Sequence, residues 1–151
     1  MPFALVLVAG CVAPAAAADA QSTKCALLTK GEVEQAIGPS DGGKSELTNQ
    51  WGLQGCRWTA TSSTRNAPPG WLDSVEVAVF DPSKTAWARA EAKGEPVPAL
   101  GEAAVYDDHS GDLWFECAGT RLCVVKVRTA SGATREDTAR RLAQSVQGRV
   151  K

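Results

Sequence analysis

The sequence predicts an α+β domain in which helices pack on a mainly antiparallel sheet of about six strands. Its 151 residues are enough for one domain with a sizeable core. Apolar residues make up 44% and charged residues 22%, which are ordinary globular values. Strand-like segments fall into two groups of three, and helix-like segments precede, separate and follow these groups. Such an order is typical of helices packed on an antiparallel sheet.

The first half of the domain reads as one helix followed by three strands. Thr29 and Glu32 have the spacing of a capping box, so a helix begins there and ends before Gly38-Pro39. Val75, Val77 and Val79 alternate with other residues and predict a half-buried strand. The three expected strands are 45–50, 55–61 and 74–80.

The second half repeats this order. Asp81 as cap and Pro82 at the first helical position begin a helix that runs to about Lys93. Thr134, with Asp137 three residues later, caps a final helix. The strands expected between these helices are 103–107, 112–117 and 122–129, and the apolar positions of the final helix are Ala139, Leu142, Ala143 and Val146. Two copies of one αβββ unit plus a C-terminal helix would explain this order.

Residues 1–20 read as an export leader, and 25–151 as the folded domain. Residues 1–18 carry no charged side chain, and Val8-Ala9-Gly10-Cys11 has the form of a lipobox, which predicts lipidation of Cys11. Ala18-Asp19-Ala20 has the form of a secretory cleavage site. Both readings place the protein outside the cytoplasm, in the periplasm or the cell envelope.

Four cysteines remain when Cys11 is lipidated or removed, and they predict two disulfides. If Cys117 lies opposite Cys123 in a hairpin, Phe115 pairs with Val125 on one face. The same register pairs Leu113 with Val127 there, and pairs Trp114 with Lys126 and Asp112 with Arg128 on the other face. Because a one-residue slip would mix the two faces, we predict the pairs Cys117–Cys123 and Cys25–Cys56.

Two groups of residues resemble a known family. They are Cys25-Ala26-Leu27-Leu28-Thr29 with Gly55-Cys56-Arg57-Trp58, and Pro98-Ala99-Leu100-Gly101-Glu102 before an aromatic strand. Over residues 25–150 the chain resembles the small exported bacterial lipoproteins catalogued as domain of unknown function 3558. The resemblance implies an extracytoplasmic α+β domain, supplies no activity, and by analogy of fold with receptor sensor domains implies a sensing or binding role.

The residues do not favour an enzyme. The lone histidine, His109, lies in a polar Asp-rich stretch typical of a turn. The sequence contains no nucleophile elbow, phosphate loop or dinucleotide fingerprint, and the spacings fit neither zinc nor calcium, so we expect no cofactor. A net charge of −1 argues against a nucleic-acid partner.

A binding role is the main functional expectation. Exposed aromatics are common in binding surfaces, and the candidate patch consists of Trp51, Trp71, Trp114 and Lys126. Its partner would be an envelope protein, a glycan or a small ligand. The alternative is an envelope hydrolase or a thiol-redox enzyme that uses Cys117 and Cys123.

Charge is unevenly distributed along the chain. Residues 73–116 carry three basic and ten acidic side chains, whereas residues 121–151 carry eight basic and two acidic ones. We expect the final helix to neutralise the middle segment; a basic face turned to an anionic partner is the alternative.

Overall fold

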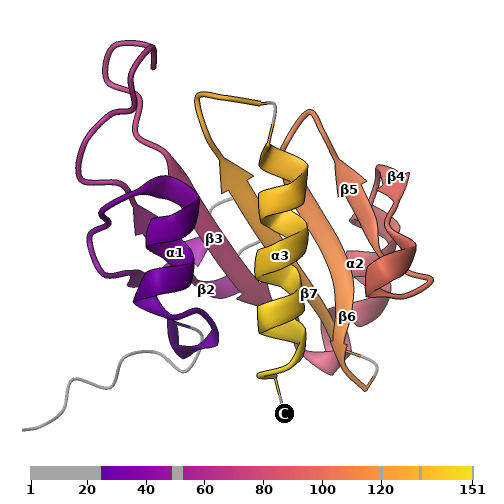
Figure 1. Ribbon diagram of the computed structural model, residues 1–151. Helices are drawn as coiled ribbons and strands as arrows, with labels where there is room; N and C mark the ends of the chain where they lie inside the picture. The colour runs from indigo at the N-terminus through magenta and orange to yellow at the C-terminus, as the bar shows by residue number, and fades with distance from the viewer. Residues whose placement is uncertain (1–24, 49–52, 120, 133, 151) are drawn as a thin grey trace, which may run out of the picture.

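A seven-stranded antiparallel sheet forms the centre of the computed structural model (Figure 1), which describes residues 25–48, 53–119, 121–132 and 134–150. Its strand order is β1-β2-β3-β7-β6-β5-β4. The strands are β1 (Lys44–Thr48), β2 (Leu53–Thr59), β3 (Ser74–Val79), β4 (Glu95–Pro96), β5 (Val105–Asp107), β6 (Asp112–Ala118) and β7 (Arg121–Arg128). The α+β class is therefore confirmed, with one strand more than expected. The extra strand, β4, has only two residues, too few to produce an alternating pattern.

Three α-helices pack on this sheet. They are α1 (Lys30–Ile37), α2 (Thr85–Glu91) and α3 (Arg135–Gln147), and the short 3-10 helices are η1 (Cys25–Leu27), η2 (Pro82–Lys84) and η3 (Pro98–Leu100). Helices α1 and α3 lie on one face, and α2 lies on the other (Figure 1). No helix among the described residues is long and apolar enough to cross a membrane.

The strand order is symmetric about the β3–β7 pair, as a duplicated unit would require. A twofold axis through that pair and perpendicular to the sheet would place α1 and α2 on the same face. They lie on opposite faces, and the second half has four strands instead of three. The expected duplication is therefore wrong.

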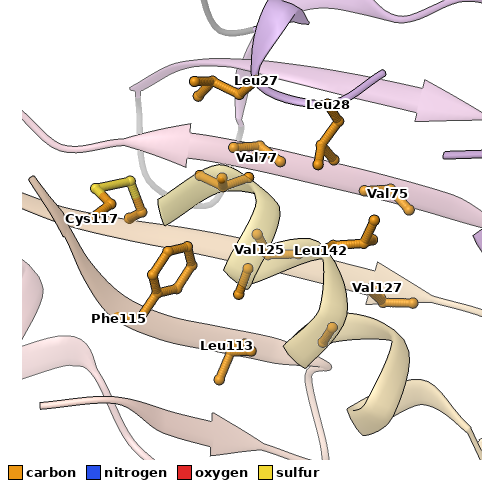
Figure 2. Close-up of a cluster of buried hydrophobic side chains, with 14 of the residues drawn as sticks. Leu27, Leu28, Val75, Val77, Leu113, Phe115, Cys117, Val125, Val127 and Leu142 are labelled. Carbon is orange, nitrogen blue, oxygen red and sulfur yellow. A yellow bond between two sulfur atoms is a disulfide. The ribbon is translucent and has the colours of Figure 1, made fainter. Parts of the chain in front are cut away.

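The main core lies between the sheet and the pair α1 and α3. Figure 2 shows Leu142 of α3 above Val125 and Val127 of β7, with Phe115 of β6 beside them. All four predicted apolar positions of the final helix are buried. Full burial of one such leucine stabilises the fold by roughly 1.5–3 kcal/mol, so this face supplies much of the driving force.

The capping predictions have different outcomes. The capping box of α1 is confirmed, because the Thr29 hydroxyl accepts from the Glu32 amide at 3.3 Å and Glu32 Oε2 accepts from the Thr29 amide at 2.8 Å. Thr134 makes no such bond, since its φ of −120° and ψ of 8° are not the extended conformation of an N-cap. Asp81 does not cap α2 either, because η2 comes first and the Asp81 carboxylate faces Arg121 at 3.8 Å.

The β6–β7 hairpin differs from the predicted register by two residues. Phe115, not Cys117, lies opposite Cys123, and Trp114 lies opposite Val124 instead of Lys126. One residue of this shift arises at the hairpin end, where Ala118 pairs with Arg121, and the other arises from a β-bulge between Glu116 and Ala118, which gives β6 one extra residue. A shift of two residues preserves the two faces, so the apolar set stays on the core side.

Both predicted disulfides are present, and they fit an extracytoplasmic protein. Cys25–Cys56 joins η1 to β2, and the Trp58 indole lies in the same buried cluster. Cys117–Cys123 joins the bulge of β6 to β7 (Figure 2).

The expected half-burial of β3 is wrong, because every residue of this central strand is buried, Glu76 included.

Candidate functional site

The sheet face that carries α2 also carries charged side chains, two of which are buried carboxylates. A row of charged side chains crosses five neighbouring strands in register, and we call it the charged row. Its members, from β2 to β5, are Arg57, Glu76, Lys126, Asp112 and Asp107. Arg57 donates to Glu76 Oε1 at 3.0 and 2.7 Å, and Lys126 Nζ lies 3.3 Å from Asp112 Oδ1. The first four charges of the row alternate in sign and hold two buried carboxylates, those of Glu76 and Asp112, in ion pairs.

Asp107 ends the charged row at the turn between β5 and β6. Its Oδ1 accepts from the His109 amide at 2.9 Å, and its Oδ2 accepts from the Ser110 hydroxyl at 3.0 Å. Burial alone would raise the pKa of Asp107, but the hydrogen bonds from Ser110 and His109 outweigh it and lower the pKa. This carboxylate is therefore charged at neutral pH.

Glycine is required in this turn. Gly111 has a φ of 77°, and a Cβ there would overlap the carbonyl oxygen of Val127. That close approach lets the Gly111 carbonyl accept from the Val127 amide at 3.1 Å, so the turn is fixed against β7.

A hollow of about 130 Å³ lies between this turn and α2, and we call it the Trp87 hollow. It is lined by Trp87, Glu91, Lys93, Asp107, Ser110, Asp112 and Trp114. Three carboxylates face one ammonium group, so the lining is acidic. Two indoles from different elements complete the lining.

Trp87 is the residue of this site that the sequence did not reveal. Its side chain is 44% exposed, and its ring centroid lies 6.0 Å from that of Phe80. Ala88 is the buried residue of α2, a helix of seven residues. A helix of seven residues with a single buried position carries no apolar stripe from which the exposure of Trp87 could be predicted.

The predicted patch of four residues is only partly brought together. Trp114 is 3% exposed, so the expectation that it is an exposed aromatic is wrong. Its ring lies 5.4 Å from that of Phe80, in the small core cluster beneath α2. Lys126 belongs to the charged row, and Trp51 lies outside the described residues, as does Cys11.

Trp71 lies just before β3, beside the end of β7. Its Nε1 donates to Asp73 Oδ1 at 2.8 Å, and the Arg128 guanidinium lies 5.1 Å from the centre of its ring. Trp71 is half-buried and held on two sides. It does not line the Trp87 hollow.

The four arginines of α3 and of the residues just after it all have partners within the chain. Arg135 pairs with Asp108 and donates to the Tyr106 hydroxyl at 3.2 Å, which agrees with the expected neutralisation of the middle segment. The others pair with the first helix or with α3 itself: Arg149 with Glu32, Arg141 with Gln35, and Arg140 with Glu136. Internal pairing thus accounts for this basic cluster.

The described residues contain no cluster of three or more histidine, cysteine or acidic side chains arranged to hold a metal. His109 is exposed, and the neighbouring Ser110 hydroxyl donates to Asp107 instead of to the imidazole. Cys117 and Cys123 are buried, at 5% and 0% exposure.

These features define an α+β domain with a disulfide-linked core and an acidic, tryptophan-lined hollow. No family model, curated protein or solved structure matches the chain. The resemblance to domain of unknown function 3558 stays a prediction.

Proposed function

We propose that the protein is an exported, non-enzymatic binding module of the cell envelope, and that its Trp87 hollow receives a basic side chain of a partner protein. The observation that carries the proposal is the exposed Trp87 indole beside the Glu91 carboxylate. The side chains of Glu91 and Lys93 have no hydrogen bond or ion pair within the described part of the chain.

The size and charge of the hollow support this choice of ligand. Pockets for whole small molecules usually measure about 300–1,000 Å³, so a hollow of about 130 Å³ suits a single head group. A guanidinium or ammonium group there gains charge-assisted hydrogen bonds from the carboxylates and a cation–π contact from Trp87. Charged contacts at the edge of an interface speed the encounter with a partner and help to select the correct one.

The test is an NMR titration of the Trp87 indole signal with two capped pentapeptides. One peptide has a central arginine between glycines, and the other has norleucine in its place. We expect the signal to move with the arginine peptide, and a Glu91→Gln variant to bind at least about threefold more weakly. Glu95→Gln, an exposed change on β4 outside the hollow, is the matched control and should leave binding unchanged. Equal binding of the norleucine peptide, or no response at Trp87, would contradict the proposal.

The two disulfides and the uncharged, alanine-rich segment 1–18 support export. Intact mass of the protein recovered from the envelope distinguishes the two processing routes. A lipid on Cys11 as the new N-terminus indicates anchoring, and an N-terminus at Gln21 indicates cleavage. A full-length mass with free thiols would contradict export.

The alternative, an envelope hydrolase or a thiol-redox enzyme, has weaker support. The only histidine is not hydrogen-bonded to a described serine or cysteine, as a nucleophile–base pair would require. Redox catalysis needs an accessible thiolate, whereas Cys117 and Cys123 are buried.

A further inference from the structure

A second, polar pocket lies at the end of β3 and β7, away from the Trp87 hollow. It has a volume of about 320 Å³ and lies between the loop that precedes β3 and the segment that follows β7. Its lining consists of Thr64, Arg65, Asn66, Asp73, Ala130 and Ser131. We call it the Asp73 pocket.

Asp73 is a buried residue whose carboxylate accepts hydrogen bonds at only one of its two oxygens, among the described residues. It is 3% exposed, and its Oδ1 accepts from Trp71 Nε1 at 2.8 Å and from the Ala130 amide at 2.9 Å. Its Oδ2 accepts no hydrogen bond from the residues that the structure describes. A buried carboxylate normally has its oxygens satisfied by donors, so a donor from outside the chain fits this position.

Arg65 brings the opposite charge to the same pocket. It is exposed, and it has no ion pair or hydrogen bond with the described residues. It therefore does not neutralise Asp73, although both line the pocket. The turn that carries Arg65 is closed by a hydrogen bond of 3.0 Å from the Ala67 amide to the Thr64 carbonyl, with Asn66 at a φ of 74°.

We propose that the Asp73 pocket binds a small zwitterion, a free α-amino acid. The ligand's ammonium group donates to Asp73 Oδ2, and its carboxylate accepts from the Arg65 guanidinium. Two unpaired opposite charges in one pocket match a ligand that carries both charges better than a cation, an anion or a neutral sugar. The volume accommodates an amino acid, and the inference does not depend on the Trp87 hollow.

The indole of Trp71 supplies the readout, because its N–H is bonded to Asp73. The full chain is titrated with L-alanine, N-acetyl-L-alanine and L-alaninamide while the Trp71 indole signal is followed by NMR. We expect L-alanine to move the signal, and each blocked derivative, which lacks one charge, to bind at least about tenfold more weakly.

Two substitutions test the assigned contacts. Arg65→Gln, at an exposed loop position, should weaken L-alanine binding at least about tenfold without changing the fold. Arg89→Gln, on α2 beside Glu116, is the matched control and should bind as the unmodified chain does. Asp73→Asn keeps Oδ1 as an acceptor and should also lose binding, with circular dichroism reporting whether the fold is retained.

Three results would overturn the proposal. They are an unchanged affinity in the Arg65→Gln variant, equal binding of a blocked derivative, and no response of Trp71 to millimolar L-alanine. If glucose moves the Trp71 signal where L-alanine does not, the third result assigns the pocket to a neutral sugar.

Discussion

Arg149 holds Glu32 with both of its terminal nitrogens, at 2.6 Å to Oε2 and 2.9 Å to Oε1. Glu32 is also the acidic member of the α1 capping box, and Arg149 also donates to the Leu27 carbonyl at 2.9 Å. One guanidinium thus joins the segment after α3 to the start of α1. The bond to Arg149 is the main cause that lowers the pKa of Glu32 to about 2 from the usual 4.5.

The Glu32–Arg149 pair should make stability depend on pH in the acid range. A lowered carboxylate pKa stabilises the fold above the unfolded pKa of 4.5, and this contribution is lost as the pH falls toward about 2. Glu32→Gln should cost about 1–2 kcal/mol at pH 7, discounted because the Arg149 side chain is 37% exposed. Urea unfolding at pH 7 and pH 3 measures the difference in the free energy of unfolding between the Glu32→Gln variant and the unmodified chain. This difference should be smaller at pH 3. Glu34→Gln, which breaks an exposed pair with Lys30, is the control, and an equal loss there would contradict the assignment.

The two disulfides should contribute unequally. Cys25–Cys56 closes a separation of 31 residues and Cys117–Cys123 one of 6, so the first restricts the unfolded chain more. Replacing Cys25 and Cys56 by serine should cost roughly 2–4 kcal/mol, and the same change at the hairpin pair should cost less. Urea unfolding of both double variants measures the free energy that each disulfide contributes. A larger loss of stability in the hairpin variant would contradict this prediction.

Gly111 and Gly31 form a matched pair for substitution by alanine. At Gly111 the added Cβ meets the Val127 carbonyl and φ is 77°, so we expect a loss of about 2–4 kcal/mol. At Gly31, in α1, no atom from outside the helix's own backbone and the two neighbouring residues lies within 4 Å of the added Cβ. There alanine should stabilise the fold by about 0.5–1 kcal/mol through its helix propensity. Thermal unfolding measures the change in stability of each alanine variant. Similar changes at the two positions would show that the contact with the Val127 carbonyl is unimportant.

The Cys117–Cys123 disulfide should resist reduction while the protein is folded, because both cysteines are buried. Treatment with a mild reductant followed by a thiol-alkylating reagent should label neither cysteine in native protein and both in urea. Rapid labelling of the native protein would instead favour the thiol-redox alternative.

Local patterns predicted much of the fold. The Thr29 capping box and the apolar face of α3 follow from spacings of a few residues, and the two disulfide pairs follow from the short spacing of Cys117 and Cys123 and the two cysteines that remain. Each of these features is present in the structure. The register of the hairpin was not predictable in this way. A disulfide constrains the distance between two cysteines, and the bulge at Glu116–Ala118 meets that constraint with different strand partners.

The candidate sites depend on tertiary contacts that no local pattern encodes. Exposure of Trp87 and burial of Trp114 depend on which sheet face α2 covers, and the sequence pattern leaves that choice open. The Asp73 pocket joins residues of two loops about 60 positions apart in the chain. Its charges could be recognised only after the sheet had placed β3 beside β7.

The position of the Cys25–Cys56 disulfide has a mechanical consequence. A pull on the chain upstream of Cys25, such as a membrane tether would exert, passes through a covalent bond directly into β2. The covalent path from the tether to β2 therefore bypasses the segment between the two cysteines, which includes α1 and β1. In β2 the load first meets the hydrogen bonds to the two neighbouring strands, β1 and β3.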